Sequence, residues 1–241
     1  MSRRRLSLLA LLGAGLLAAG ALTGCATGAA SSSPTADAAS PAPTTAAAAE
    51  VKAGWLDAGR SIAIVTLGSS SCIPTATETP VLEGRVLTVT LADSENTACT
   101  RDMAARATPV MMPEGTDPTQ GLEIRVTGAL EGATILAGLP EAPVAVPEFS
   151  PSAGWVDRTT VAVLTWGSSS CRPTVATVAA AGSAVELAFA SPPADQICTM
   201  DMAPRVTLAE VGAVAGDGAV ELVLTGGNVA SEGPIPVLGV R

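Results

Sequence analysis

The chain carries two copies of one sequence pattern, about 99 residues apart, and this repeat constrains the fold more than any other feature. GWLDAGRSIAIVTLGSSSC at 54–72 matches GWVDRTTVAVLTWGSSSC at 154–171. CTRDMAARAT at 99–108 matches CTMDMAPRVT at 198–207, and GLEIRVTG at 121–128 matches AVELVLTG at 219–226. A unit of about 90 residues is long enough to be a small domain. The pattern therefore predicts a tandem domain duplication rather than a solenoid of short repeats.

Four cysteines recur with the repeat, and each pair is separated by 27 positions. Four cysteines allow three pairings, and the symmetry of the repeat favours Cys72–Cys99 and Cys171–Cys198. Closing such a loop stabilises each copy by about 3.5 kcal/mol in the chain-entropy account. A four-cysteine zinc site is the alternative, and the absence of histidine and of any C-x-x-C spacing disfavours it.

The pattern inside each copy is that of β-strands. SIAIVTL and TVAVLTW are short runs rich in β-branched residues, typical of strands covered on both faces. RVLTVTL and AVELAF alternate, which places Leu87, Val89 and Leu91 on one face of a sheet, and Val185, Leu187 and Phe189 on another. Glycines in LEGR (82–85), AAGS (180–183) and AGDGA (215–219) indicate hairpin turns.

We therefore expect an all-β protein of two tandem, small, disulfide-stapled domains, each a β-sandwich or partly open barrel of five to six strands. The expected boundaries are 51–140 for the first domain and 153–241 for the second. A proline-rich linker is expected between them at 141–152.

The N-terminal residues are typical of an export signal. Three arginines precede an apolar run that ends in LTGC, which predicts a signal peptide at 1–24. LTGC resembles the lipobox of bacterial lipoproteins, and the resemblance implies acylation of Cys25 and a palmitate-bearing anchor in the cell membrane. Residues 25–50, rich in Ala, Ser, Thr and Pro, are then expected to be a disordered tether that displays the protein on the extracytoplasmic face. Ser2-Arg3-Arg4 also resembles a twin-arginine export signal, so these residues are compatible with the Sec and the twin-arginine route alike.

The charge of the chain limits its partners. Formal net charge is −9, and removal of Arg3, Arg4 and Arg5 with the signal peptide leaves 22 acidic and 10 basic residues, or −12. Such an acidic chain is not expected to bind nucleic acid. Expected partners are the membrane, through the lipid anchor, and an envelope protein, peptide or cell-wall component. We expect no cofactor and no metal, because the sequence has no phosphate-binding loop and no calcium-loop spacing.

Two polar clusters are the candidate binding residues: Ser69, Ser70, Ser71 and Asp102 in the first copy, and Ser168, Ser169, Ser170 and Asp201 in the second. A serine nucleophile needs a neighbouring base, usually histidine, and the chain has none. The structural alternative makes the serines turn residues and each aspartate a cap or a partner of Arg106 or Arg205. An envelope hydrolase using carboxylates or an atypical serine is the alternative function.

The repeated Gly-Trp-x-Asp has two interpretations. Trp55 and Trp155 could be exposed platforms for a ligand, but a tryptophan at the start of a first strand more often packs on the core. Trp166 occupies the place of Leu67, so we expect that position to be apolar and buried. A transporter-type solute-binding protein, the third function class, needs α/β lobes, and the sequence predicts no helices to build them.

The duplicated unit resembles actinobacterial lipoproteins and secreted proteins that carry G-S-S-S-C-x-P followed by C-T-x-D. Here the motif spans Gly68–Pro74 with Cys99–Asp102, and Gly167–Pro173 with Cys198–Asp201. The resemblance implies no activity and assigns no functional residue. We expect a non-catalytic binding or interaction module.

Overall fold

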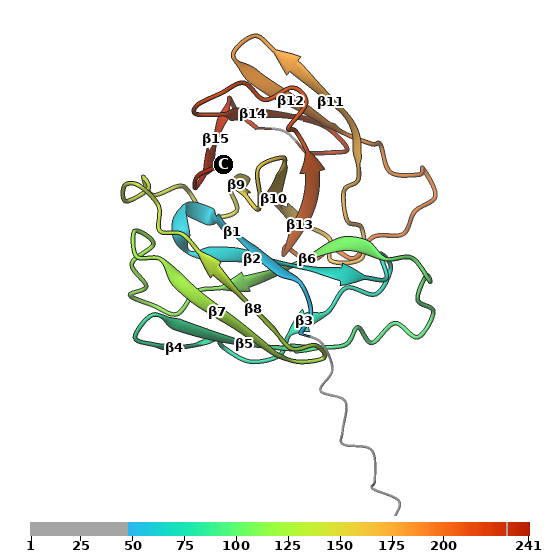
Figure 1. Ribbon diagram of the computed structural model, residues 1–241. Coiled ribbons are helices and arrows are strands. Elements are labelled where there is room, and N and C mark those ends of the chain that lie inside the picture. The colour runs from blue at the N-terminus through green and yellow to red at the C-terminus, as the bar shows by residue number, and fades with distance from the viewer. Residues whose placement is uncertain (1–47, 230) are drawn as a thin grey trace, which may run out of the picture. The chain divides into compact units, whose positions relative to one another are not determined.

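The computed structural model describes residues 48–229 and 231–241, which fall within one compact unit. The protein is all-β, as predicted: the described residues form fifteen strands, a three-residue 3-10 turn η1 (Asp57–Gly59) and no α-helix (Figure 1). In this part of the chain no helix is long and apolar enough to cross a membrane. The predicted signal peptide, Cys25 and the predicted tether up to residue 47 lie outside the described residues.

The first copy contains two sheets. One has the order β1-β2-β6, and the other has the order β3-β5-β7-β8, with β4 paired to β5. The strands are β1 (Val51–Leu56), β2 (Ser61–Gly68), β3 (Thr75–Ala76), β4 (Val81–Glu83), β5 (Val86–Ala92), β6 (Ala104–Met111), β7 (Leu122–Gly128) and β8 (Gly132–Leu136).

The second copy repeats this order in one seven-stranded sheet, β11-β12-β14-β15-β9-β10-β13. Parallel pairing of β15 with β9 joins its two parts. In the first copy β8 likewise meets the start of β1, where the Ala49 amide donates to the Glu131 carbonyl. The strands are β9 (Ser152–Trp155), β10 (Thr160–Gly167), β11 (Val175–Ala181), β12 (Ala184–Phe189), β13 (Ala203–Glu210), β14 (Glu221–Gly226) and β15 (Ile235–Leu238).

Each copy encloses its own apolar core, and the predicted alternation of the strands supplies it. Leu87, Val89 and Leu91 of β5 are buried against Trp55 and the inner residues of β2 and β7. In the second copy the corresponding residues of β12 are buried in the same way: Val185, Leu187 and Phe189. Both predicted inward-facing sets are therefore correct.

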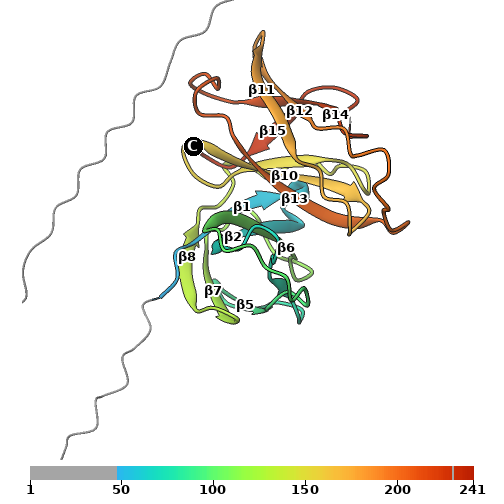
Figure 2. The ribbon, with the colours of Figure 1, turned by 90° about the vertical axis from the view of Figure 1, so that its right-hand side faces the viewer.

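A third core lies between the two copies and explains why β2 and β10 are apolar on both faces. Ile62 and Ile64 of β2 face the first core, whereas Ala63 and Val65 face the second copy. β10 repeats this arrangement, with Val161 and Val163 turned inward and Ala162 and Leu164 turned toward the first copy. The prediction that these runs are covered on both faces is confirmed, and the cover on one face is the other copy. Figure 2 shows β2 and β6 beside β10 and β13.

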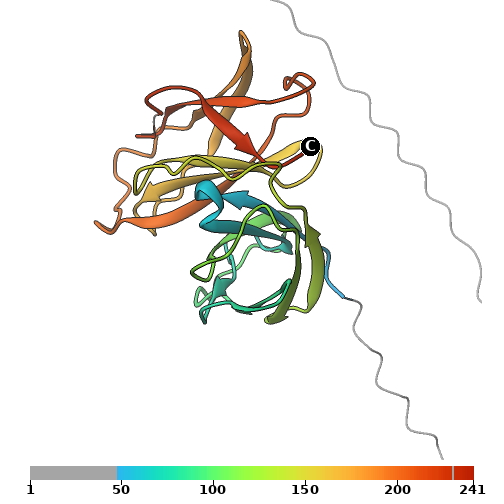
Figure 3. The ribbon, with the colours of Figure 1, turned by 90° about the vertical axis from the view of Figure 1, so that its left-hand side faces the viewer.

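The two Gly-Trp dipeptides meet at this junction. A methyl group at Gly54 would lie 2.6 Å from the Trp155 carbonyl oxygen, and one at Gly154 would overlap the Trp55 carbonyl oxygen. Each glycine thus lets the backbone of the other copy approach closely. Trp55 and Trp155 are buried in their own cores, so their predicted packing role is confirmed. Figure 3 shows the junction of the two copies from the side opposite to Figure 2.

Two hairpin predictions are correct and one is wrong. Two-residue turns with Gly84 and Gly182 at positive φ join β4 to β5 and β11 to β12. AGDGA precedes β14, which pairs in parallel with β12 and not with the preceding β13. It is therefore a crossover turn. The described strands, eight in the first copy and seven in the second, also exceed the five to six expected, because short strands such as β3 carry a weak sequence signal.

The proline-rich segment predicted as a linker makes specific contacts with both copies. The Trp166 indole donates to the Ser150 carbonyl at 3.2 Å, and its ring meets that of Phe149 edge-on at 5.2 Å. The Ser152 hydroxyl accepts the Asp57 amide at 2.7 Å in a buried hydrogen bond. These contacts attach the segment to the body of the protein.

Candidate functional site

The first predicted cluster forms one hydrogen-bonded group beside the Cys72–Cys99 disulfide, which is present as predicted. Asp102 accepts the Ser70 amide at 3.0 Å and the Thr100 hydroxyl at 2.5 Å. The Ser69 hydroxyl lies 2.9 Å from the Thr100 hydroxyl, and the Ser71 hydroxyl accepts the Thr100 amide at 2.9 Å. The cluster therefore ties the serine turn to the segment that follows Cys99.

The second cluster repeats these contacts beside Cys171–Cys198, the second predicted disulfide. Asp201 accepts the Ser169 amide at 3.0 Å and the Thr199 hydroxyl, and Ser168 and Ser170 bond to Thr199. The Thr199 and Ser169 hydrogen bonds lower the pKa of Asp201, and bonds from Ser70 and Thr100 lower that of Asp102 to about 2. Both aspartates are thus ionised acceptors of turn hydrogen bonds.

The repeated arginines hold the serine turns by their backbone. Arg106 donates to the carbonyl of Cys72. Arg205 donates to the carbonyls of Cys171 and Trp166, both at 2.9 Å. These contacts agree with the structural interpretation of the motifs, with backbone carbonyls as the arginines' partners rather than the aspartates. The expectation of a buried apolar site at Leu67 and Trp166 is wrong: Leu67 is 48% exposed and Trp166 half-buried.

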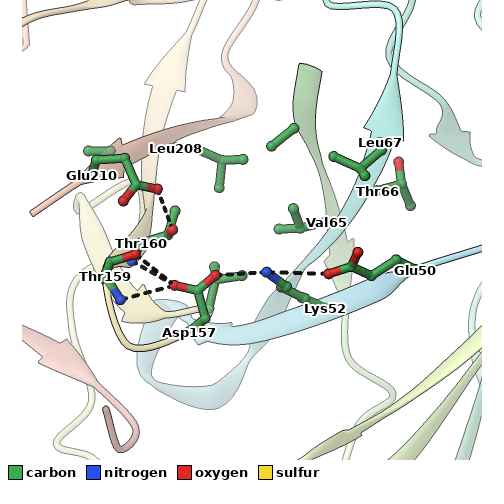
Figure 4. A pocket seen from close by; sticks show the side chains of 13 residues that line it. Glu50, Lys52, Val65, Thr66, Leu67, Asp157, Thr159, Thr160, Leu208 and Glu210 are labelled. Carbon is green, nitrogen blue, oxygen red and sulfur yellow. Dashed lines mark hydrogen bonds and ion pairs between the residues drawn. The ribbon is translucent and has the colours of Figure 1, made fainter. Parts of the chain in front are cut away.

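A pocket of about 390 Å³ lies where the two copies meet, and we take it as the candidate site (Figure 4). This volume is in the range of small-ligand sites. Both copies line it, with aliphatic and charged side chains: Glu50, Lys52, Val65, Thr66, Leu67, Ala105, Val156, Asp157, Thr159, Thr160, Leu208, Ala209 and Glu210. We call it the junction pocket.

An ion pair between the two copies lies at one side of the junction pocket. Residues alternate along β1, so that Lys52 shares the face of Gly54 and Leu56, which is turned toward the second copy. The Lys52 ammonium donates to Asp157 at 3.0 Å and lies 3.5 Å from Glu50. The bond to Asp157 raises the pKa of Lys52. Lys52 is the only lysine of the chain.

Asp157 is held in place by its own turn. Its carboxylate accepts the amides of Thr159 and Thr160 at 3.0 and 2.9 Å. Burial by itself would raise the pKa of Asp157, but these amide bonds and the bond from Lys52 outweigh it and lower the pKa. Asp157 is therefore a fixed, ionised acceptor, and only one of its oxygens is used by Lys52.

A third carboxylate lies across the junction pocket. Glu210, on β13, accepts the Thr160 hydroxyl at 2.5 Å. In Figure 4, Thr160 and Asp157 lie between Glu210 and Lys52, and the aliphatic side chains of Leu208 and Val65 lie beside this row. The pocket thus combines three carboxylates and one ammonium with an aliphatic lining. It favours a ligand with a positive end and an apolar body. No group of three or more metal-ligating side chains with the geometry to hold an ion occurs among the described residues.

Sequence reasoning did not select Lys52, Asp157 or Glu210. The Gly-Trp-x-Asp motif suggested a role for its tryptophans and none for its aspartate. Two sequence features could have pointed to Lys52. It is the only lysine in the sequence, and it lies two residues before Gly54, which faces the second copy. Its partner Asp157 is 105 positions away, which no local pattern indicates.

Comparisons of the chain with models of known protein families, with curated proteins and with solved structures found no match.

Proposed function

We propose that the protein is a lipid-anchored, non-catalytic binding protein on the extracytoplasmic face of the cell membrane. Its ligand is a small cation, or the basic side chain of an envelope peptide or cell-wall component, held in the junction pocket. The observation that carries this proposal is the excess of carboxylates over cations around an aliphatic cavity lined by both copies.

The charges of the junction pocket argue for a cation. Lys52 compensates one of the three carboxylates, which leaves two negative charges beside the aliphatic side chains of Val65, Leu67 and Leu208. A ligand ammonium or guanidinium can approach Glu210 and Glu50 without displacing Lys52. An anion would have to bind Lys52 next to Asp157 and Glu50, which opposes its entry.

The binding proposal predicts that organic cations bind and that Glu210→Gln lowers their affinity. We expect 1,5-diaminopentane and N-acetyl-arginine methylamide to bind, and butyrate not to bind. Glu210→Gln should lower the affinity for both cations about tenfold, because a single charge-assisted contact is worth about 1.5 kcal/mol. Isothermal titration calorimetry of the full chain in detergent measures both effects. Glutamine retains the acceptor for the Thr160 hydroxyl, so the fold is preserved.

Glu123→Gln is the matched control for this experiment. Glu123 is a partly exposed carboxylate that pairs with Arg125 at 2.7 Å on β7, and it does not line the junction pocket. Its substitution should leave the affinity for both cations unchanged. Equal weakening by Glu123→Gln, or binding of butyrate as tight as that of the diamine, would contradict a cation site in this pocket.

The anchor proposal rests on the lipobox resemblance at Leu22–Cys25. We expect Cys25→Ala to move the protein from the membrane fraction to the soluble fraction, because acyl chains on this cysteine are the proposed membrane attachment. Fractionation of expressing cells, with the intact mass of the extracted protein, measures the change. An unsubstituted protein that carries no lipid mass would rule out the anchor and leave the cation-binding proposal untouched.

We further propose that 51–140 and 153–241 are two domains of the sandwich or partly open barrel type. Support comes from their separate cores and from the same strand order in both copies. The third core and the ion pair between Lys52 and Asp157 support a fixed relation between the two domains, which the junction pocket needs.

A further inference from the structure

The outer strand of the second copy differs from its counterpart in the first copy in a way that bears on association. β11 is the last strand of the seven-stranded sheet, and among the described residues only β12 pairs with it. An edge strand presents unpaired backbone N–H and C=O groups on its free side. Figures 1 and 3 show this hairpin, in light orange, reaching out from the rest of its sheet.

The first copy protects the corresponding edge and the second copy does not. In the first copy the edge is broken into β3 and β4, which have two and three residues, and it carries Glu78, Pro80 and Glu83. Short strands, charges and proline are the usual means of preventing edge pairing. β11 has seven residues, VATVAAA, and the whole stretch 173–185 has no charged residue.

The side chains of β11 allow a second strand to come close. Val175 and Val178 pack against the core of the second copy, whereas Thr177, Ala179 and Ala181 are exposed. None of these exposed side chains is charged, so a strand that pairs at the usual spacing of about 4.8 Å meets no like charge across from it. The other end strand of this sheet, β13, carries Pro204 and Arg205 and is less suited to pairing.

We infer that β11 pairs with β11 of a second copy of this chain, antiparallel about a two-fold axis. The chain is acidic, with a net charge of −9, so two copies repel each other over most of their surface. The neutral edge is a place where they can approach without that repulsion. A two-fold axis sets identical neutral, small residues against one another, which makes the strand self-complementary.

Cysteine cross-linking of the full chain tests this pairing. We expect Ala179→Cys to give a disulfide-linked species of twice the mass under oxidising conditions, because a two-fold axis near the middle of β11 brings the two copies of residue 179 within cross-linking distance. Thr77→Cys, at an exposed position in the corresponding segment of the first copy, is the matched control and should give no disulfide-linked species, although it keeps the native β11. An equal yield of disulfide-linked dimer from both variants, or none from Ala179→Cys, would overturn the inference.

A charge test separates pairing from misfolding. The double substitution Thr177→Lys with Ala179→Lys places like charges on both strands of the proposed pair, which opposes pairing. Within one chain the lysine at position 179 lies beside Glu186, the cross-strand neighbour of Ala179, so its charge meets an opposite charge there. We expect sedimentation velocity in detergent to show the mass falling from dimer to monomer with an unchanged circular dichroism spectrum. The inference would also be overturned if the unsubstituted chain sediments as a monomer, or if it sediments as a complex with a different polypeptide.

Discussion

Gly154→Ala is expected to lower the free energy of unfolding by about 3 kcal/mol, at the upper end of the range for overpacking a well-packed site. The added methyl group would overlap the carbonyl oxygen of Trp55 in β1. That atom belongs to the backbone, so no rotamer change can move it away. The two copies must then separate along β1 and β9, which loosens the third core between them.

Two other glycines calibrate this prediction. A methyl group at Gly54 would lie 2.6 Å from the Trp155 carbonyl oxygen, so Gly54→Ala should cost less than Gly154→Ala. Gly216 has no atom within 4 Å of such a methyl group, and Gly216→Ala should change stability little. Urea denaturation of the three variants measures the order. Equal stability of Gly154→Ala and Gly216→Ala would mean that the two copies do not meet at the Gly-Trp dipeptides.

Removing one disulfide by Cys171→Ala with Cys198→Ala is expected to cost about 3.5 kcal/mol, because the unfolded chain gains the freedom of the opened loop. If the two copies unfold together, as one body of about 190 residues, such a loss corresponds to a fall in Tm of about 7–14 °C. Both bridges span 27 positions, so Cys72→Ala with Cys99→Ala should cost a similar amount. Differential scanning calorimetry measures the two shifts.

The serine clusters provide the control for the disulfide experiment. They join the same two segments through hydroxyl and carboxylate groups, but these groups are exposed, and their hydrogen bonds compete with water. Asp201→Asn should therefore shift Tm much less than loss of Cys171–Cys198. A larger effect of Asp201→Asn would show that the hydrogen-bonded cluster, and not the disulfide, holds the loop.

The sequence was sufficient where the determining contacts repeat or are close along the chain. The recurrence of the cysteines selects the pairing that the structure has, because two copies of one unit bury equivalent residues in equivalent places. Alternation identifies the inner faces of β5 and β12, since side chains in a strand point to opposite faces in turn. It does not reveal the parallel pairing of β5 with β7 or of β12 with β14, because alternation carries no information on strand order.

The candidate site depended on tertiary structure almost entirely. The sequence selected the serine turns, which form self-contained hydrogen-bonded groups, and it did not select Lys52, Asp157 or Glu210. Asp157 and Glu210 both bind Thr160 within the second copy, and Lys52 reaches Asp157 only because the outer faces of β2 and β10 bury each other. Thus the sequence alone determined the all-β class, the duplication and the disulfides, which arise within each copy. The packing of one copy on the other decided the junction pocket, because the residues that line it come from segments about a hundred positions apart.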